Sequence, residues 1–164
     1  MKQTHFAAAA AAFLGALLCT AQAAEPSADA RQLDRAFERS TLQIATPDAR
    51  LHTIKVWVAD DDAHRARGLM FVDQLDDDAG MLFIYEQPQP ITMWMKNTHL
   101  SLDMLFVSAD GRVHHIVENT KPMSLDTISS EGNVVAVIEL KAGSAARMKI
   151  RPGARVIHPA FKPG

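Results

Sequence analysis

Cysteine is almost absent from this sequence, which has one in 164 residues. The single residue, Cys19, lies in an apolar N-terminal segment. If that segment is removed, the mature chain has no thiol. This excludes disulfides, a thiol nucleophile and a thiolate metal site, so the fold has to be held together by its hydrophobic core.

An excess of basic charge is also lacking. The chain has 17 Lys and Arg against 19 Asp and Glu, a formal net charge of -2, and no block of basic residues. Nucleic-acid binding relies on a basic patch or stripe, so we expect no nucleic-acid partner. Beyond the N-terminal segment no apolar run approaches the roughly 20 residues of a membrane helix, so we expect no transmembrane segment in the mature chain.

The N-terminal segment has the pattern of an export signal. Lys2 precedes an alanine-rich apolar run at 6–18, and small residues follow around 21–23. A basic start, a short apolar stretch and small residues before a cleavage site are typical of a signal peptide. We therefore expect residues 1–23 to be a signal peptide cleaved after Ala23, and the mature protein to be a periplasmic monomer.

The rest of the sequence predicts a tether followed by one domain. Residues 24–40 are polar and alanine-rich, and we expect a tether or short helix outside the core. From 41 to 164 short apolar stretches alternate with turn signals, which predicts strands at Thr41–Ala45, Leu51–Ala59, Met81–Tyr85, Ile91–Lys96, Leu102–Val107, Arg112–Glu118, Val134–Leu140 and Ala154–His158. Two short helices are predicted, at Asp60–Arg67 and Gly143–Met148. This pattern favours a mainly β, compact β-sandwich or jelly-roll-like barrel.

The segment after Pro90 holds the first candidate site. On a strand, alternate residues share a face, so Trp94 and Lys96 point one way and Met93 and Met95 the other. If the methionines face the core, Trp94 is presented outward beside a cation and the amide of Asn97. Such a group can stack on a flat ligand and orient its polar atoms. The alternative is that Trp94 simply covers one end of the barrel.

Two carboxylates, Asp103 and Glu139, stand inside strongly apolar strands. Burying a carboxylate is costly unless it is paired, and Lys96, Arg67 and Asn97 are the plausible partners. One reading is an acid/base enzyme that uses Asp103 and Glu139 with Lys96 as electrostatic stabiliser. The other is a buried polar network that holds loops against the sheet.

Metal chemistry has weaker support. Thioethers are soft ligands suited to Cu(I), so Met93, Met95 and His99 offer a copper-handling alternative. Methionine more often fills irregular cores. The histidines lack zinc-site spacings, and nothing resembles a nucleophile elbow, a phosphate loop or a dinucleotide fingerprint. We expect no cofactor and no resident metal.

Several short motifs, in order along the chain, resemble a known family. They are Arg-Gly-Leu-Met at 67–70, Gly-Met-Leu-Phe at 80–83, Trp-Met-Lys-Asn-Thr at 94–98, Leu-Asp-Met-Leu-Phe at 102–106, Val-Glu-Asn at 117–119 and Val-Ile-Glu-Leu at 137–140. The chain is similar in these to domain of unknown function 192. The resemblance implies a compact mainly-β fold, often exported from bacteria, without an established activity. The family's pattern residues fall on Arg67, Gly68, Trp94, Lys96, Asn97, Asp103 and Glu139.

The sequence thus predicts an exported binding domain for a small molecule or an envelope component, and favours this over an enzyme. The predicted ligand-binding residues are Trp94, Lys96, Asn97, Asp103, Arg67 and Glu139. In this hypothesis Trp94 stacks on the ligand, Lys96 and Asn97 orient its polar groups, and Asp103 holds Lys96 in place.

Overall fold

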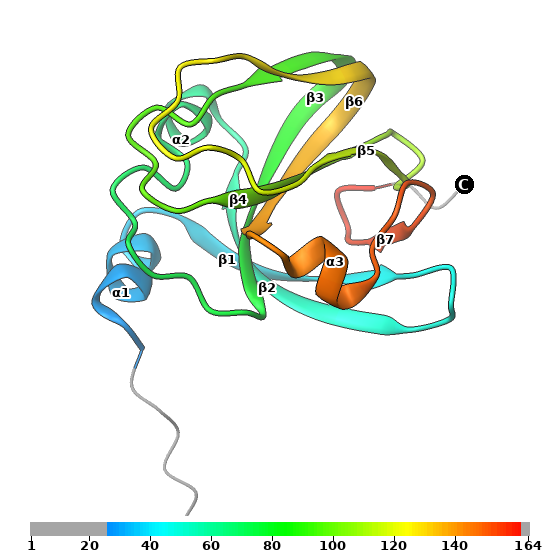
Figure 1. Cartoon of the computed structure of the whole chain (residues 1–164), viewed down its shortest axis with the longest axis horizontal. Helices are drawn as coiled ribbons and strands as arrows, with labels where there is room; N and C mark the ends of the chain where they lie inside the picture. Colours follow the sequence, from blue (N-terminus) through cyan, green and yellow to red (C-terminus); the bar gives the residue numbers. More distant parts are fainter. Residues whose placement is uncertain (1–25, 162–164) are drawn as a thin grey trace, which may run out of the picture.

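The structure is a computed structural model that describes residues 26–161 (Figure 1). Seven strands form one sheet, and three short helices lie against it. In chain order the elements are α1 (Ala28–Asp34), β1 (Glu38–Ala45), β2 (Leu51–Ala59), α2 (Asp62–Arg67), β3 (Ala79–Met93), β4 (Leu102–Val107), β5 (Val113–Val117), β6 (Ile128–Lys141), α3 (Ser144–Met148) and β7 (Arg155–Ile157). The predicted mainly-β class is confirmed, with three short helices where two were expected.

The sheet is curled on itself. Its strand order is β5-β4-β6-β3-β2-β1-β7, and only β2 and β3, which α2 connects, pair in parallel. The two edges meet where Arg112 bridges to Arg155 and the Val113 N–H donates to the Ala154 carbonyl at 2.9 Å. Figure 1 shows β5 and β7 together on this side. Of the two arrangements expected from the sequence, the structure therefore has the barrel-like one, a half-barrel formed by a single sheet.

Both faces of the sheet are covered, because alternate residues of each strand point to opposite faces. The inner face gathers apolar residues from all seven strands, among them Leu42, Ile54, Leu82, Leu105, Val113, Ile138 and Val156. The outer face carries a second cluster that includes Met81, Phe83, Met104, Phe106 and Val137. Helix α1 and the segments after α2 and β3 cover this second cluster. No helix among residues 26–161 is long and apolar enough to cross a membrane.

The N-terminal segment packs against the domain. The Ser27 side chain caps α1 by accepting from the Ala30 N–H at 3.0 Å. Leu33 and Phe37 are buried in the outer core, and the Trp57 indole N–H donates to Asp34 at 2.8 Å. The expectation that residues 24–40 lie outside the core is therefore wrong for the part that the structure describes. The predicted signal peptide, 1–23, lies outside the described residues.

Strand β3 is longer than predicted. The sequence predicts one strand that ends at Tyr85 and another that begins at Ile91, yet β3 continues through Pro88 and Pro90 to Met93. Within β3, only Ala79–Phe83 pair with β2, so the second half of β3 has β6 on one side and solvent on the other. A proline lacks the N–H for a second ladder, and it is tolerated on such an edge stretch.

Strand β6 is also longer than the predicted Val134–Leu140, because it begins at Ile128 and runs through Glu131-Gly132-Asn133. Between the pairs Pro90–Asn133 and Thr92–Ser129, β6 advances four residues while β3 advances two. The extra residues form an irregularity in the ladder, with Glu131 at φ 55°. The Ser130 hydroxyl holds it in place, because it accepts from the Ile91 N–H and donates to the Gly132 carbonyl.

Candidate functional site

A pocket opens on the outer face where α2, β3, the loop after β3 and β6 meet. Its volume is about 210 Å³. Sites for drug-sized ligands are roughly 300–1,000 Å³, so this one suits a smaller molecule or a single side chain. We call it the Glu139 pocket. It is lined by Arg65, Ala66, Arg67, Gly68, Leu69, Met70, Phe83, Tyr85, Thr92, Met93, Trp94, Lys96, Thr98 and Glu139.

Four of the six predicted ligand-binding residues line this pocket. Arg67 comes from the last turn of α2, Trp94 and Lys96 from the loop after β3, and Glu139 from β6. These positions are up to 72 residues apart in the chain, and only the fold brings them together. Asn97 and Asp103 are not among the lining residues, and their positions are described below.

Helix α2 places its arginines because both of its ends are fixed. The Asp61 carboxylate caps the start by accepting from the His64 N–H at 2.8 Å. Gly68 ends the helix at φ 47° and ψ -138°, a conformation that only glycine adopts readily. A Cβ at Gly68 would also lie 3.0 Å from the Phe83 ring. A glycine is therefore needed for α2 to pack against β3 beside the pocket.

The alternation predicted around Trp94 is found, although β3 ends at Met93 rather than at Lys96. Met95 is completely buried, whereas Trp94 is 50% exposed. The Lys96 ammonium lies over the Trp94 ring, 5.5 Å from its centroid. Trp94 and Lys96 thus form a cation–π pair at the mouth of the pocket.

Glu139 is the most unusual group in the pocket. It is 4% exposed and lies opposite Met81 of β3 and Met104 of β4, on the outer face of the sheet. Its carboxyl forms no hydrogen bond or ion pair with another described side chain. Burial raises the pKa of Glu139 to about 8, because an apolar environment disfavours the charged form. The carboxyl is therefore mostly uncharged at neutral pH and able to donate a hydrogen bond.

Tyr85 and Arg65 are pocket residues that the sequence did not reveal. Burial raises the pKa of Tyr85, while the nearby Arg65 guanidinium opposes this shift and the Glu139 carboxyl adds to it. The Tyr85 hydroxyl has only the Met93 sulfur as a partner, at 3.8 Å. Tyr85 is the only tyrosine of the chain, and its alternation with Phe83 was the one available signal. For Arg65 the sequence contains no such signal, because its position in the pocket depends on the packing of α2 against β3.

Asp103 has a structural role. It is completely buried, and its two oxygens accept from the Asn119 N–H at 2.9 Å and the Ala145 N–H at 2.8 Å. It thus ties the loop after β5 and the start of α3 to the sheet. The expected contact with Lys96 is wrong, because the ladder pairs Asp103 with Leu140 and so directs its side chain to the inner face.

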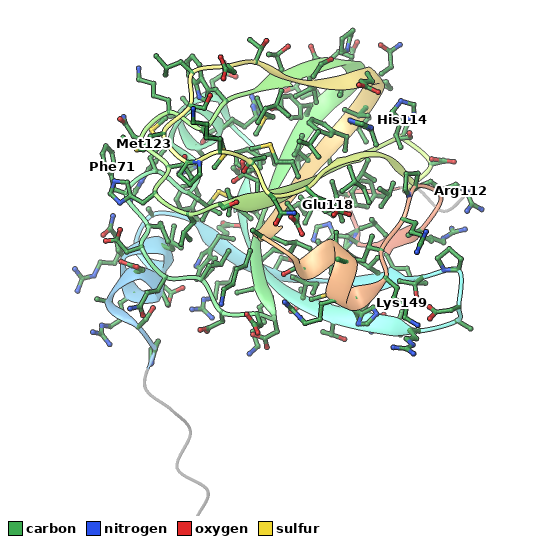
Figure 2. The ribbon with its side chains drawn as sticks, viewed as in Figure 1. Phe71, Arg112, His114, Glu118, Met123 and Lys149 are labelled. Atoms are coloured by element: carbon green, nitrogen blue, oxygen red, sulfur yellow. The ribbon has the colours of Figure 1, made fainter. Side chains whose placement is uncertain are left out.

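Asn97 shapes the loop beside the pocket. It has φ 54°, and its carbonyl accepts from the Phe71 N–H at 2.9 Å. Asparagine is one of the few residues that adopt this left-handed conformation readily. The neighbouring Thr98 carbonyl accepts from the Met123 N–H at 3.0 Å. Figure 2 shows Phe71 and Met123, both more than half exposed, on the side of the molecule that carries α2.

The residues of the copper alternative differ in their surroundings. Met95 is completely buried in the outer core, and Met93 packs against the same cluster. His99 is exposed, and its Nδ1 lies 2.7 Å from an Asp73 oxygen. A Cu(I) site needs these three side chains to converge on one point, and this arrangement gives that reading no support.

Comparison with protein families identifies the fold. The model of domain of unknown function 192, described as "Uncharacterized ACR", matches residues 43–158. The chain belongs to this family, DUF192. The resemblance inferred from the sequence motifs is thereby confirmed. All the pattern residues from Arg67 to Glu139 lie inside the matched DUF192 segment, including the four that line the pocket.

Two solved structures share the DUF192 fold of this chain. One is a protein from Sinorhizobium meliloti that has been suggested to be a transcription regulator; it is 38% identical, with a TM-score of 0.75, over 76% of this chain and 97% of that one. The other, from Novosphingobium aromaticivorans, is a protein of unknown function; it is 31% identical, with a TM-score of 0.73, over 85% of this chain and 94% of that one. A search of the curated proteins gives no match.

Proposed function

We propose that this protein is an exported binding protein that holds a small molecule in the Glu139 pocket. The observation that carries the proposal is the Glu139 carboxyl, which is buried, has no described partner and faces an open pocket. An unpaired buried carboxyl costs stability. A ligand that hydrogen-bonds to it would offset this cost, which a purely structural carboxyl such as Asp103 avoids through its own partners.

The surroundings of Glu139 also support binding. Trp94 offers a half-exposed ring at the mouth, and the Tyr85 hydroxyl lacks a strong acceptor. Polar groups that converge on a partly apolar pocket are typical of small-molecule sites. Export is supported by the signal-peptide pattern of residues 1–23.

The acid/base alternative has less support. Glu139 is paired with Met104 across the ladder and Asp103 with Leu140, so the two carboxyls leave opposite faces of the sheet. They cannot act together on one substrate. Regulation of transcription, suggested for the Sinorhizobium meliloti relative, would need a surface for nucleic acid. This chain has a net charge of -2, and lysines such as Lys55 and Lys141 are paired with aspartates.

Replacing Trp94 with alanine is expected to weaken ligand binding at least tenfold while leaving the protein folded, because half of the ring is exposed and little packing is lost. The measurement is a thermal-shift panel of organic acids, amines, sugars, nucleotides and peptidoglycan fragments, on wild type and variant. A ligand at 100 times its Kd stabilises by about 2.7 kcal/mol.

Phe71→Ala is the matched control for Trp94→Ala. Phe71 is 56% exposed and lies on a neighbouring loop, but it does not line the pocket. It should keep the shift that Trp94→Ala loses. If both variants shift like wild type, or if no compound in the panel stabilises wild type, the proposed binding site is wrong.

A further inference from the structure

The charges around the Glu139 pocket are unequal. Three cations, Arg65, Arg67 and Lys96, are among its lining residues, and Glu139 is the only carboxyl among them. These four and Tyr85 are the charged and titratable groups that line the pocket. None of the cations forms an ion pair with Glu139. When the Glu139 carboxyl holds its proton, it carries no negative charge, and the charges that line the pocket are all positive.

The Arg65 guanidinium already has hydrogen-bond partners within the protein. It donates to the carbonyls of Asp60 and Ile84, at 2.6 Å and 2.8 Å, and to the Asp62 carboxylate at 2.6 Å. Its Cζ atom also lies over the Tyr85 ring, 5.0 Å from the centroid. Arg65 is therefore a fixed part of the pocket wall.

Arg67 and Lys96 have no carboxylate partner among residues 26–161. The Arg67 guanidinium lies over the Phe37 ring and the Lys96 ammonium over the Trp94 ring. Elsewhere on the surface, cations such as Lys141 and Arg39 are paired with acids. The Phe37 and Trp94 rings each already lie against a cation of the protein, so they are not free to bind a cationic ligand. The unpaired charges of Arg67 and Lys96 instead favour an anion.

The inner end of the pocket presents hydrogen-bond donors. A protonated Glu139 carboxyl has an O–H to donate, and the Tyr85 hydroxyl has only a weak sulfur acceptor. Apolar side chains, including Leu69, Met70 and Phe83, form the remaining walls. A ligand that fits has oxygens that accept hydrogen bonds, a negative charge and an apolar part.

We propose, on the basis of the binding function inferred above, that the ligand is a small organic carboxylate. Its oxygens accept hydrogen bonds from Glu139 and Tyr85, and its charge is balanced by Arg67 and Lys96. Its apolar part packs against the apolar walls of the pocket, which include Leu69, Met70 and Phe83. The ligand then binds only to the protein whose Glu139 carboxyl is protonated, so ligand affinity depends on pH.

The test compares three molecules with the same ring and different charge. Benzoate is an anion, benzamide is neutral and benzylamine is a cation. Isothermal titration calorimetry at pH 7 should give at least tenfold tighter binding for benzoate than for benzamide, and no binding of benzylamine. Above pH 8 the benzoate affinity should fall by up to about tenfold per pH unit, because Glu139 loses its proton.

Variants separate the roles of the two kinds of group. Glu139→Gln keeps a neutral donor, so it should retain benzoate binding within a few fold at pH 7 and no longer lose it above pH 8. Lys96→Met removes a charge at similar length and should weaken benzoate binding at least tenfold. Lys121→Met is the control, since Lys121 is an exposed lysine of the loop between β5 and β6 that does not line the pocket.

Other outcomes would overturn the proposal. Preference for benzylamine, with binding lost in Glu139→Gln, would make the pocket a cation site and leave the binding function intact. Binding of inorganic phosphate without benzoate would show an oxyanion site that takes no organic acid. If none of the three molecules binds, the charge of any ligand found in the thermal-shift panel decides between the outcomes: an anion supports the proposal, and a cation or a neutral molecule overturns it. A panel in which no compound binds rejects the binding function itself.

Discussion

Wild-type protein is expected to lose about 5 kcal/mol of unfolding free energy, relative to the Glu139→Gln variant, as the pH rises from well below 4.5 to well above 8. The pKa of Glu139 is raised by burial from 4.5 to about 8. Between these values the folded protein keeps a proton that the unfolded chain has released, so stability falls with rising pH. Each pKa unit is worth about 1.4 kcal/mol.

Urea denaturation at a series of pH values measures this loss. The Glu139→Gln variant has no carboxyl at this position, so its difference from wild type isolates the Glu139 contribution from that of the histidines and other acids. Glu118→Gln is the control, because Glu118 is an exposed carboxyl at the end of β5 and should follow the wild-type profile. Parallel profiles for wild type and Glu139→Gln would show that the carboxyl is ordinary.

Replacing Asp103 with alanine is expected to lower the free energy of unfolding by about 2–6 kcal/mol. Alanine leaves the Asn119 and Ala145 N–H groups without an acceptor, and an unpaired buried donor costs about 1–3 kcal/mol each. The Ala145 N–H belongs to the first turn of α3, whose N-cap residue Gly143 provides no side-chain cap. Loss of Asp103 should therefore loosen α3 as well as the loop after β5.

Urea denaturation and amide hydrogen exchange together check this prediction. Asp103→Asn keeps one acceptor oxygen and should fall between wild type and Asp103→Ala. Exchange at Asn119 and Ala145 should accelerate more than exchange in β2. A loss below 1 kcal/mol for Asp103→Ala would contradict the structural role assigned to this carboxylate.

Strands could be predicted where the sequence pattern was local. The bounds of β2 and β4 are those expected, because Ile54, Val56 and Val58 alternate in β2 and turn residues flank both strands. The length of β3 and β6 could not be predicted. Pro88, Pro90 and Gly132 are ordinary strand breakers, and they are tolerated only because β3 and β6 pair with each other beyond the edge of β2.

The candidate site was predicted in part. Polar or aromatic residues in apolar surroundings led to Trp94, Lys96 and Glu139, and the fold brings all three to one pocket. Asp103 satisfied the same criterion and yet faces the other side of the sheet. The difference lies in the ladder register between β4 and β6, which the sequence does not specify.

The most direct test of this account is an NMR titration of the Glu139 side-chain carboxyl, with and without benzoate. We expect its pKa near 8 in the free protein and a higher value with benzoate bound, because a bound anion stabilises the protonated form. A carboxyl that titrates in the ordinary range of glutamate, and is unaffected by benzoate, would contradict the account. Glu139 would then be charged at neutral pH and unable to donate a hydrogen bond to an anionic ligand.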